Sequence, residues 1–103
     1  MLRKARVFVH NQPAGVLSAL SDQEYTFVYD ADYRGAPVSL TMPVSQSYYS
    51  FQTFPPFFEG LLPEGAMLGA LLKKYKLDKN DFFGQLLVVG DDVVGAVRIE
   101  VCA

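Results

Sequence analysis

The chain has 103 residues, half of them hydrophobic, and a formal net charge of −2. This length and apolar content suit one globular domain, assigned to residues 1–103, and exclude a disordered chain. The acidic balance also argues against direct binding to nucleic acid, which needs a basic surface, because the only lysine cluster comprises Lys73, Lys74 and Lys76.

The sequence also indicates where the protein resides. A single cysteine, Cys102, cannot form an internal disulfide and suits a reducing compartment. The N-terminus does not have the pattern of a signal peptide, and no apolar run is long enough to span a membrane. We therefore expect a cytoplasmic protein that does not contact the membrane.

The N-terminal third predicts an antiparallel meander of three strands. Residues Arg3–His10 alternate in hydrophobicity, and Asn11–Gly15 contains the Asn, Pro and Gly typical of turns. Val16–Leu20 then predicts a returning strand. Glu24–Asp30, rich in aromatic residues on one side, predicts the third strand.

The middle of the chain is less regular. Residues Val38–Val44 predict a short strand that ends near Pro43. Residues Ser45–Pro56 are polar and aromatic without a clear period, so we interpret them as an ordered loop. The next segment, Phe57–Gly65, reads FFEGLLPEG, which is too interrupted for a long helix and too apolar for an ordinary solvated loop.

Two helices and a closing strand are predicted for the rest. The first helix follows Gly65 and carries an apolar stripe of Met67, Leu68, Leu71, Leu72 and Tyr75. The second helix has Asp78 as its expected N-cap and an apolar face that contains Phe82, Phe83, Leu86 and Leu87. Residues 90–92 end it, and Val93–Val101 predict a strand.

This order of elements predicts an α+β fold. A small antiparallel sheet, open or curled into a partial barrel, forms from the N-terminal meander and the C-terminal strand. A helix pair packs on one side of that sheet.

No catalytic or cofactor-binding pattern is recognisable. His10 has no second histidine with which to bind a metal, and nothing near Cys102 in the sequence would activate its thiol. Asp91 and Asp92 suit a turn better than acid–base catalysis. We therefore expect neither an enzyme nor a cofactor or metal site.

The segment Phe57–Gly65 allows two interpretations. Its apolar residues could plug the sheet from a short helical turn, or some could remain exposed on a loop that Pro55, Pro56 and Pro63 make rigid. A rigid exposed loop loses little entropy on binding, and exposed apolar patches usually mark partner surfaces. Glu59 and Glu64 could cap a helix or meet a basic side chain of a partner.

The same segment carries a resemblance. FFEGLLPEG, the following helix, Leu77–Leu87 and the turn Gly90–Ala96 together resemble the N-terminal subdomain of HipA-type toxin kinases. The early hairpin is similar too, although it has Gln12 where the family often has glycine. The resemblance covers nearly the whole chain but none of the kinase core, because the nucleotide-binding loop, the catalytic aspartate and the metal-binding acids have no counterparts here.

The resemblance implies a function. The free-standing version of this subdomain, HipS, belongs to three-component toxin–antitoxin systems linked to bacterial persistence. In these it is the antitoxin that inhibits a kinase toxin, HipT, in a complex with the DNA-binding protein HipB. Any contact with DNA would be indirect. The turn and the start of the helix are expected to meet the kinase, with residues 62–67 central and Phe57 and Phe58 holding the turn in place. The candidate partner-binding residues are Phe58, Glu59, Leu61, Leu62, Pro63, Glu64, Gly65, Ala66 and Met67.

Two alternatives stay open at this level. The chain could be a structural N-terminal subdomain that a HipA-like kinase needs for assembly rather than for inhibition. It could also be a DNA-binding autoregulatory module, although its acidic balance argues against that role.

Overall fold

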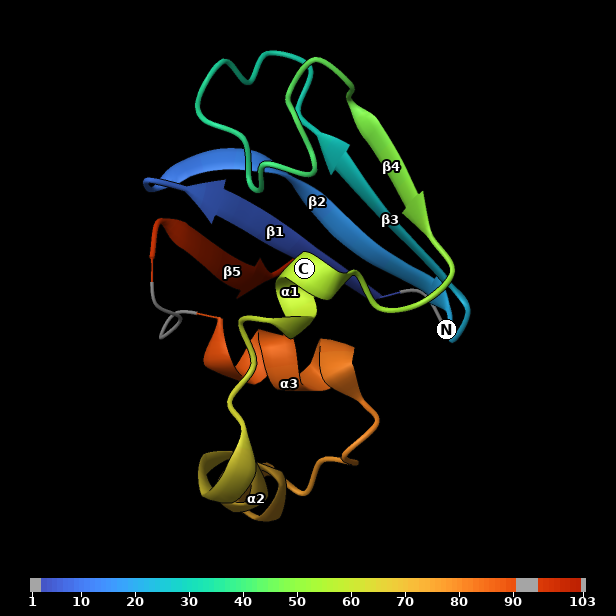
Figure 1. Cartoon of the computed structure of the whole chain (residues 1–103), viewed down its shortest axis with the longest axis vertical. Coiled ribbons are helices and arrows are strands. Elements are labelled where there is room, and N and C mark those ends of the chain that lie inside the picture. Colours follow the sequence, from blue (N-terminus) through green and yellow to red (C-terminus); the bar gives the residue numbers. More distant parts are fainter. Residues whose placement is uncertain (1–2, 91–94, 103) are drawn as a thin grey trace.

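The computed structural model describes residues 3–90 and 95–102 (Figure 1). Within these ranges the chain is α+β with an antiparallel sheet, as the sequence predicts. The sheet is open, and its strand order is β4-β3-β2-β1-β5. The strands are β1 (Arg3–Val9), β2 (Gln12–Ser21), β3 (Glu24–Tyr29), β4 (Tyr48–Phe51) and β5 (Val97–Val101). The helices are α1 (Pro56–Glu59), α2 (Gly65–Tyr75) and α3 (Phe82–Val89).

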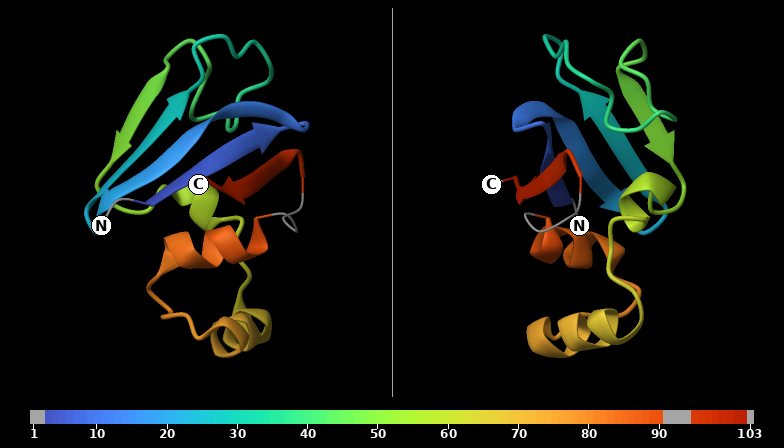
Figure 2. Two further views of the ribbon diagram at one scale, coloured as in Figure 1. Left: turned by 180° about the vertical axis from the view of Figure 1, so that it is seen from behind. Right: turned by 60° about the vertical axis from the view of Figure 1, so that its left-hand side comes forward.

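The hydrophobic core lies on one face of the sheet. Alternate side chains of β1, β2, β3 and β5 point to this face because successive residues of a strand face opposite sides. The largest side chains wholly removed from solvent include Phe27 of β3, Phe58 of α1 and Phe83 of α3. The core is thus formed where α1 and α3 cover the sheet (Figures 1 and 2).

The first hairpin is tighter than predicted. The turn consists of His10 and Asn11, whose φ angles of 50° and 65° lie in the left-handed region. Gln12 already pairs with Val9, so the predicted turn Asn11–Gly15 is wrong. Asn and His adopt positive φ more readily than most residues, and a two-residue turn with positive φ matches the twist of a hairpin.

The fourth strand is not where the sequence predicts it. Residues 38–44 form only an isolated bridge between Ser39 and Met42, and β4 lies inside the predicted loop 45–56. Tyrosine hydroxyls hold the connecting segment in place. The Tyr29 hydroxyl donates to the Met42 carbonyl at 2.5 Å and accepts from the Val38 N–H at 2.9 Å. Burial raises the pKa of the Tyr29 hydroxyl, which keeps it protonated as a donor.

The two longer helices differ from the predicted packed pair. α3 contacts β5 and α1 and buries Phe83, Gly84, Gln85 and Leu86. α2 has no buried residue and lies beyond α3, at the end of the molecule farthest from the sheet (Figures 1 and 2). Only α3 therefore packs as expected.

The C-terminal strand is confirmed in part. β5 pairs antiparallel with β1, and its side chains Val97 and Ile99 enter the core. The predicted residues Val93 and Val94, like Asp91 and Asp92, lie outside the described residues.

Candidate protein-interaction site

The helix α1 fixes the start of the FFEGLLPEG segment. Proline suits the first turn of a helix, and Pro56 begins α1 immediately after the buried Pro55. The Phe58 ring lies 6.0 Å from the ring of Phe27 on β3 and 5.2 Å from that of Phe57. Phe58 is 0% exposed. Phe58, predicted as a contact residue, therefore does not reach the surface in this structure, and its burial suits the anchoring role expected for it.

The turn between α1 and α2 combines half-buried with exposed residues. Leu61 and Leu62 are half-buried and pack against the core, and Pro63 is also half-buried. The remaining predicted contact residues are all exposed, namely Glu59, Glu64, Gly65, Ala66 and Met67. The structure thus brings eight of the nine predicted residues to a continuous stretch of surface, from Glu59 to Met67.

Backbone geometry shapes the passage into α2. Gly65, the first residue of the helix, has φ of 61°, a conformation that residues with a Cβ rarely adopt. Glu64 before it is extended, and no side chain caps the helix. Glycine at position 65 therefore allows the chain to change direction sharply, with the exposed side chains of Glu64 and Met67 on either side of the bend.

The helix α2 is amphipathic and lies outside the core cluster of the described residues. Its leucines Leu68, Leu71 and Leu72 are half-buried, none belongs to the core cluster, and Met67 is 73% exposed. Its only charged residues are Lys73 and Lys74 in the last turn, and the Lys74 ammonium lies 5.4 Å from the Tyr75 ring. An apolar stripe beside cations is a surface suited to another protein.

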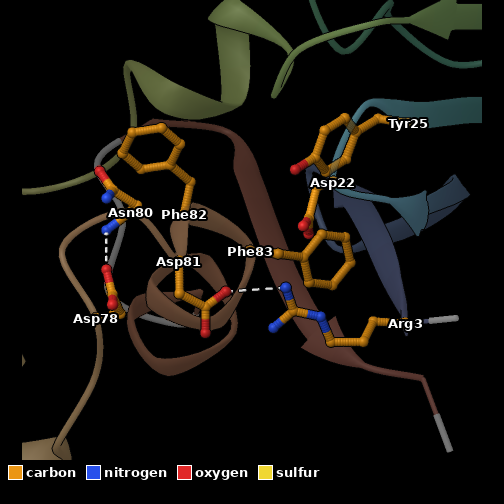
Figure 3. Close-up of a pocket in the computed structure, with 8 residues that line it drawn as sticks. All are labelled: Arg3, Asp22, Tyr25, Asp78, Asn80, Asp81, Phe82 and Phe83. Carbon is orange, nitrogen blue, oxygen red and sulfur yellow. Dashed lines mark hydrogen bonds and ion pairs between the residues drawn. The ribbon is translucent and has the colours of Figure 1, made fainter. Parts of the chain in front are cut away.

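The loop between α2 and α3 is held by a polar corner at one end of the sheet (Figure 3). Asp81 accepts a hydrogen bond from the Gly84 N–H at 3.1 Å, so Asp81, not the predicted Asp78, is the N-cap of α3. The same carboxylate pairs with the Arg3 guanidinium at 2.9 Å, which joins the start of β1 to the start of α3. The buried Gln85 donates to the carbonyls of Asp78 and Lys79.

The electrostatics of this corner favour a charged Asp81. Partial burial opposes ionisation, but the hydrogen bond from Arg3, that from the Gly84 N–H and the charge of Arg3 together outweigh it. The pKa of Asp81 is therefore lower than its ordinary value. The open hollow beside Asp81, about 560 Å³, is lined by Arg3, Asp22, Tyr25, Asp78, Asn80, Phe82 and Phe83 as well. Its polar groups stabilise the connection between sheet and helix.

The described residues offer no metal-binding cluster, because nowhere among them do three His, Cys, Asp or Glu side chains come together. The thiol of Cys102 is half-buried, and His10 is exposed in the hairpin turn. None of the helices in the described ranges is long and apolar enough to cross a membrane. These residues instead present an apolar turn, anchored by α1, and the amphipathic helix α2.

Comparison with known proteins assigns this architecture. The family model described as HipA N-terminal domain matches residues 5–100. The chain belongs to this family. An uncharacterized protein of Haemophilus influenzae is 33% identical over 100 residues, which cover 97% of this chain and 93% of that protein. A solved structure, the N-terminal domain of HipA toxin, has 32% identity and a TM-score of 0.78, and the match covers 100% of this chain and 95% of that one.

The HipA N-terminal domain is a non-catalytic subdomain, and the kinase activity of HipA lies elsewhere in that protein. The α+β fold expected from the order of elements and the family expected from FFEGLLPEG are thus both confirmed. Two features that determine the site were missed. The Arg3–Asp81 pair spans 78 positions of sequence, and a lone arginine in a strand does not indicate its partner. The buried Gln85 lies between apolar residues of α3, a pattern that could have marked it as a loop-fixing group.

Proposed function

We propose that this HipA N-terminal domain acts as an antitoxin, binding and inhibiting a HipT-like serine/threonine kinase in trans. The kinase would be held together with a HipB-like DNA-binding protein in a ternary complex. The residues that touch the kinase are Glu59 and those from Leu61 to Met67, and Phe58 holds them in place from the core.

The observation that carries the proposal is the separation of anchor from exposed surface within one short segment. Phe58 is wholly buried, whereas Met67, nine residues on, is 73% exposed. Exposing a large apolar side chain next to a rigid turn gives a preorganised contact, because the turn loses little conformational freedom on binding. Such side chains are typical anchors of protein interfaces when they fill a pocket of the partner.

The basic end of α2 supports a protein partner with an acidic rim. The chain as a whole is acidic, but the segment from Gly65 to Lys76 contains Lys73, Lys74 and Lys76 and no acid. Complementary charge would steer association and make its rate depend on salt. This uneven distribution of charge favours binding to one defined partner surface over nonspecific association.

Action in trans is favoured by the Haemophilus influenzae relative. The match to this chain covers 93% of that protein, so that protein has almost no sequence outside the shared domain. A domain that occurs nearly alone in a relative must reach any kinase through a non-covalent interface.

Co-expression tests the proposal. We expect a HipT-like kinase from the same organism to arrest growth when expressed alone, and the chain to restore growth and to co-purify with the kinase. Growth arrest that requires the chain would instead identify a structural subdomain needed for kinase assembly. If the chain alone slows the migration of DNA in a gel-shift assay at about 150 mM salt, that result would support the autoregulatory alternative.

A further inference from the structure

The two edge strands of the sheet, β5 and β4, differ in how well they are protected against pairing with another strand. At the β5 edge, the Ile99 N–H donates to the Gly90 carbonyl at 3.0 Å, and β5 carries the charged residues Arg98 and Glu100. Charges and covered backbone groups are the usual means by which proteins prevent another chain from adding to an edge strand. The β5 edge is thus protected.

The pairing of β4 with β3 determines which backbone groups of β4 face inward. The Tyr29 N–H donates to the Ser47 carbonyl at 2.8 Å, so these two opposed residues form a hydrogen-bonded pair. In an antiparallel ladder such pairs recur at every second position, and Phe27 with Tyr49 is the next of them. The N–H and C=O groups of Tyr49 therefore point toward β3.

The residues of β4 that alternate with these leave backbone groups unpaired. Tyr48 and Ser50 lie at the positions between the hydrogen-bonded pairs, so their N–H and C=O groups point away from β3. Among the described residues, the Tyr48 carbonyl accepts only from the Gln46 side chain, and no partner is found for the outward groups of Ser50. The β4 edge is thus open to another strand.

The sequence around this edge lacks charge. Residues 35–58 contain no Asp, Glu, Lys, Arg or His, in a chain in which 19% of residues are charged. β4 lies within this stretch, and Tyr48 on its outer face is 52% exposed. Charge, one of the usual protections of an edge strand, is therefore missing from the strand and from the segments that flank it.

An apolar groove runs beside the same edge, on the core side of the sheet. It has a volume of about 520 Å³, and its walls include Met42, Tyr49, Phe51, Pro55, Pro56 and Phe57. Tyr49 and Phe51 are the β4 residues whose side chains face the core side. Directly opposed residues of paired strands point their side chains to the same face of the sheet. A strand added to β4 would therefore place every second side chain in this groove.

We propose that the β4 edge binds an extended segment of a partner protein as a sixth strand, with apolar side chains at alternate positions inserted into the groove. The free backbone groups of β4 favour a partner segment in an extended conformation. The apolar walls of the groove favour apolar side chains at every second position of that segment. A second copy of this chain is a poorer occupant, because its own β4 would bring Tyr49 and Phe51, which already pack against their own core. This surface is separate from the turn and α2, so it does not depend on kinase inhibition.

Synthetic octapeptides test the proposal on the whole chain. Four peptides alternate threonine with valine, isoleucine, leucine or phenylalanine, and fluorescence anisotropy measures their binding. We expect at least one to bind with a dissociation constant below about 1 mM, and N-methylation of its alternate backbone nitrogens to weaken binding at least tenfold. No binding of any peptide, or equal binding of the methylated form, would overturn the proposal.

Matched variants locate the site. Ser50→Pro removes the outward N–H without touching the hydrogen bonds to β3, and Ser50→Thr keeps it. We expect the first to weaken binding at least tenfold and the second less than twofold, with both variants retaining the circular dichroism spectrum and melting temperature of the parent. The methylated peptide tests the same pairing should Ser50→Pro not fold. A dimer in sedimentation equilibrium that Ser50→Pro dissociates would show a second copy as the occupant and contradict the proposal.

Discussion

The helices α2 and α3 are close in sequence and both carry several large apolar side chains, yet they have opposite environments. α3 buries Phe83 and Leu86 under the sheet, whereas α2 buries none of its residues. The difference shows that an apolar stripe indicates a helix that needs a partner but does not say whether the partner is in the same chain. In this domain α3 packs under the sheet, whereas α2 stays outside the core and begins with the exposed Met67 of the proposed contact surface.

Phe58→Ala is expected to have the largest effect, and it tests the buried part of the domain, where α1 packs against the sheet. Removing a fully buried phenylalanine loses its contacts with Phe27 and Phe57 and leaves a cavity. We expect the free energy of unfolding to fall by about 3–5 kcal/mol in urea titrations monitored by circular dichroism. A loss below about 1 kcal/mol would mean that α1 is not held in the core.

A matched pair of leucines compares the helices directly. Leu86→Ala in α3 removes a side chain that is 0% exposed, and we expect a loss of about 2–5 kcal/mol. Leu72→Ala in α2 removes a half-buried side chain outside the core cluster, and we expect a loss of less than about 1 kcal/mol. Equal losses in urea titrations would show that α2 packs as firmly as α3.

The connection between the helices is tested by Asp81→Ala, which removes the N-cap of α3 and the ion pair with Arg3. We expect a loss of about 1–2 kcal/mol at pH 7, mostly from the cap. Because the pKa of Asp81 is lowered in the folded chain, its ionic contribution is complete above the unfolded value near 4 and is lost as the pH falls through the folded value.

The pH dependence is checked by repeating the urea titrations of parent and Asp81→Asn between pH 7 and pH 2. Asparagine is as good an N-cap as aspartate, so this variant isolates the charge. The difference between the two proteins should shrink as the pH falls below about 4. A difference that stays constant would show that the Arg3–Asp81 pair does not contribute.

The smallest expected effect on stability is that of Met67→Ala. Its side chain is 73% exposed, so the free energy of unfolding should change by less than about 0.5 kcal/mol in the same urea titrations. A loss above about 1 kcal/mol would mean that Met67 packs within this chain and is not available to a partner.

The sequence predicted an element correctly where its pattern of residues is compatible with only one kind of structure. The alternation of β1 and β3 identified strands, and FFEGLLPEG identified both the family and a turn with a buried and an exposed part. β4 was missed because tyrosines lie on both of its faces, so Tyr48 and Tyr49 obscure the alternation that Ser50 and Phe51 continue. The position of α2 could not be predicted, because its stripe would look the same against a sheet or against another protein.

The N-cap of α3 shows a second limit. Asp78 and Asp81 both precede the helix with suitable side chains, and Asp78 instead accepts from the Asn80 N–H at 2.7 Å within the loop. The cap Asp81 also pairs with Arg3, which lies far away in the sequence. Local capping rules cannot include such a partner.

The proposed inhibition depends on the exposed end of the segment that Phe58 anchors, and two variants test this end directly. Met67→Glu places a charge there, while Leu40→Glu places the same charge on a side chain that is 94% exposed in the connection between β3 and β4, outside the turn and α2. The measurement is the autophosphorylation rate of a HipT-like kinase titrated with each variant. We predict that Met67→Glu raises the concentration needed for half-inhibition at least tenfold and that Leu40→Glu changes it less than twofold. Equal inhibition by Met67→Glu and the parent, with both folded, would contradict the account.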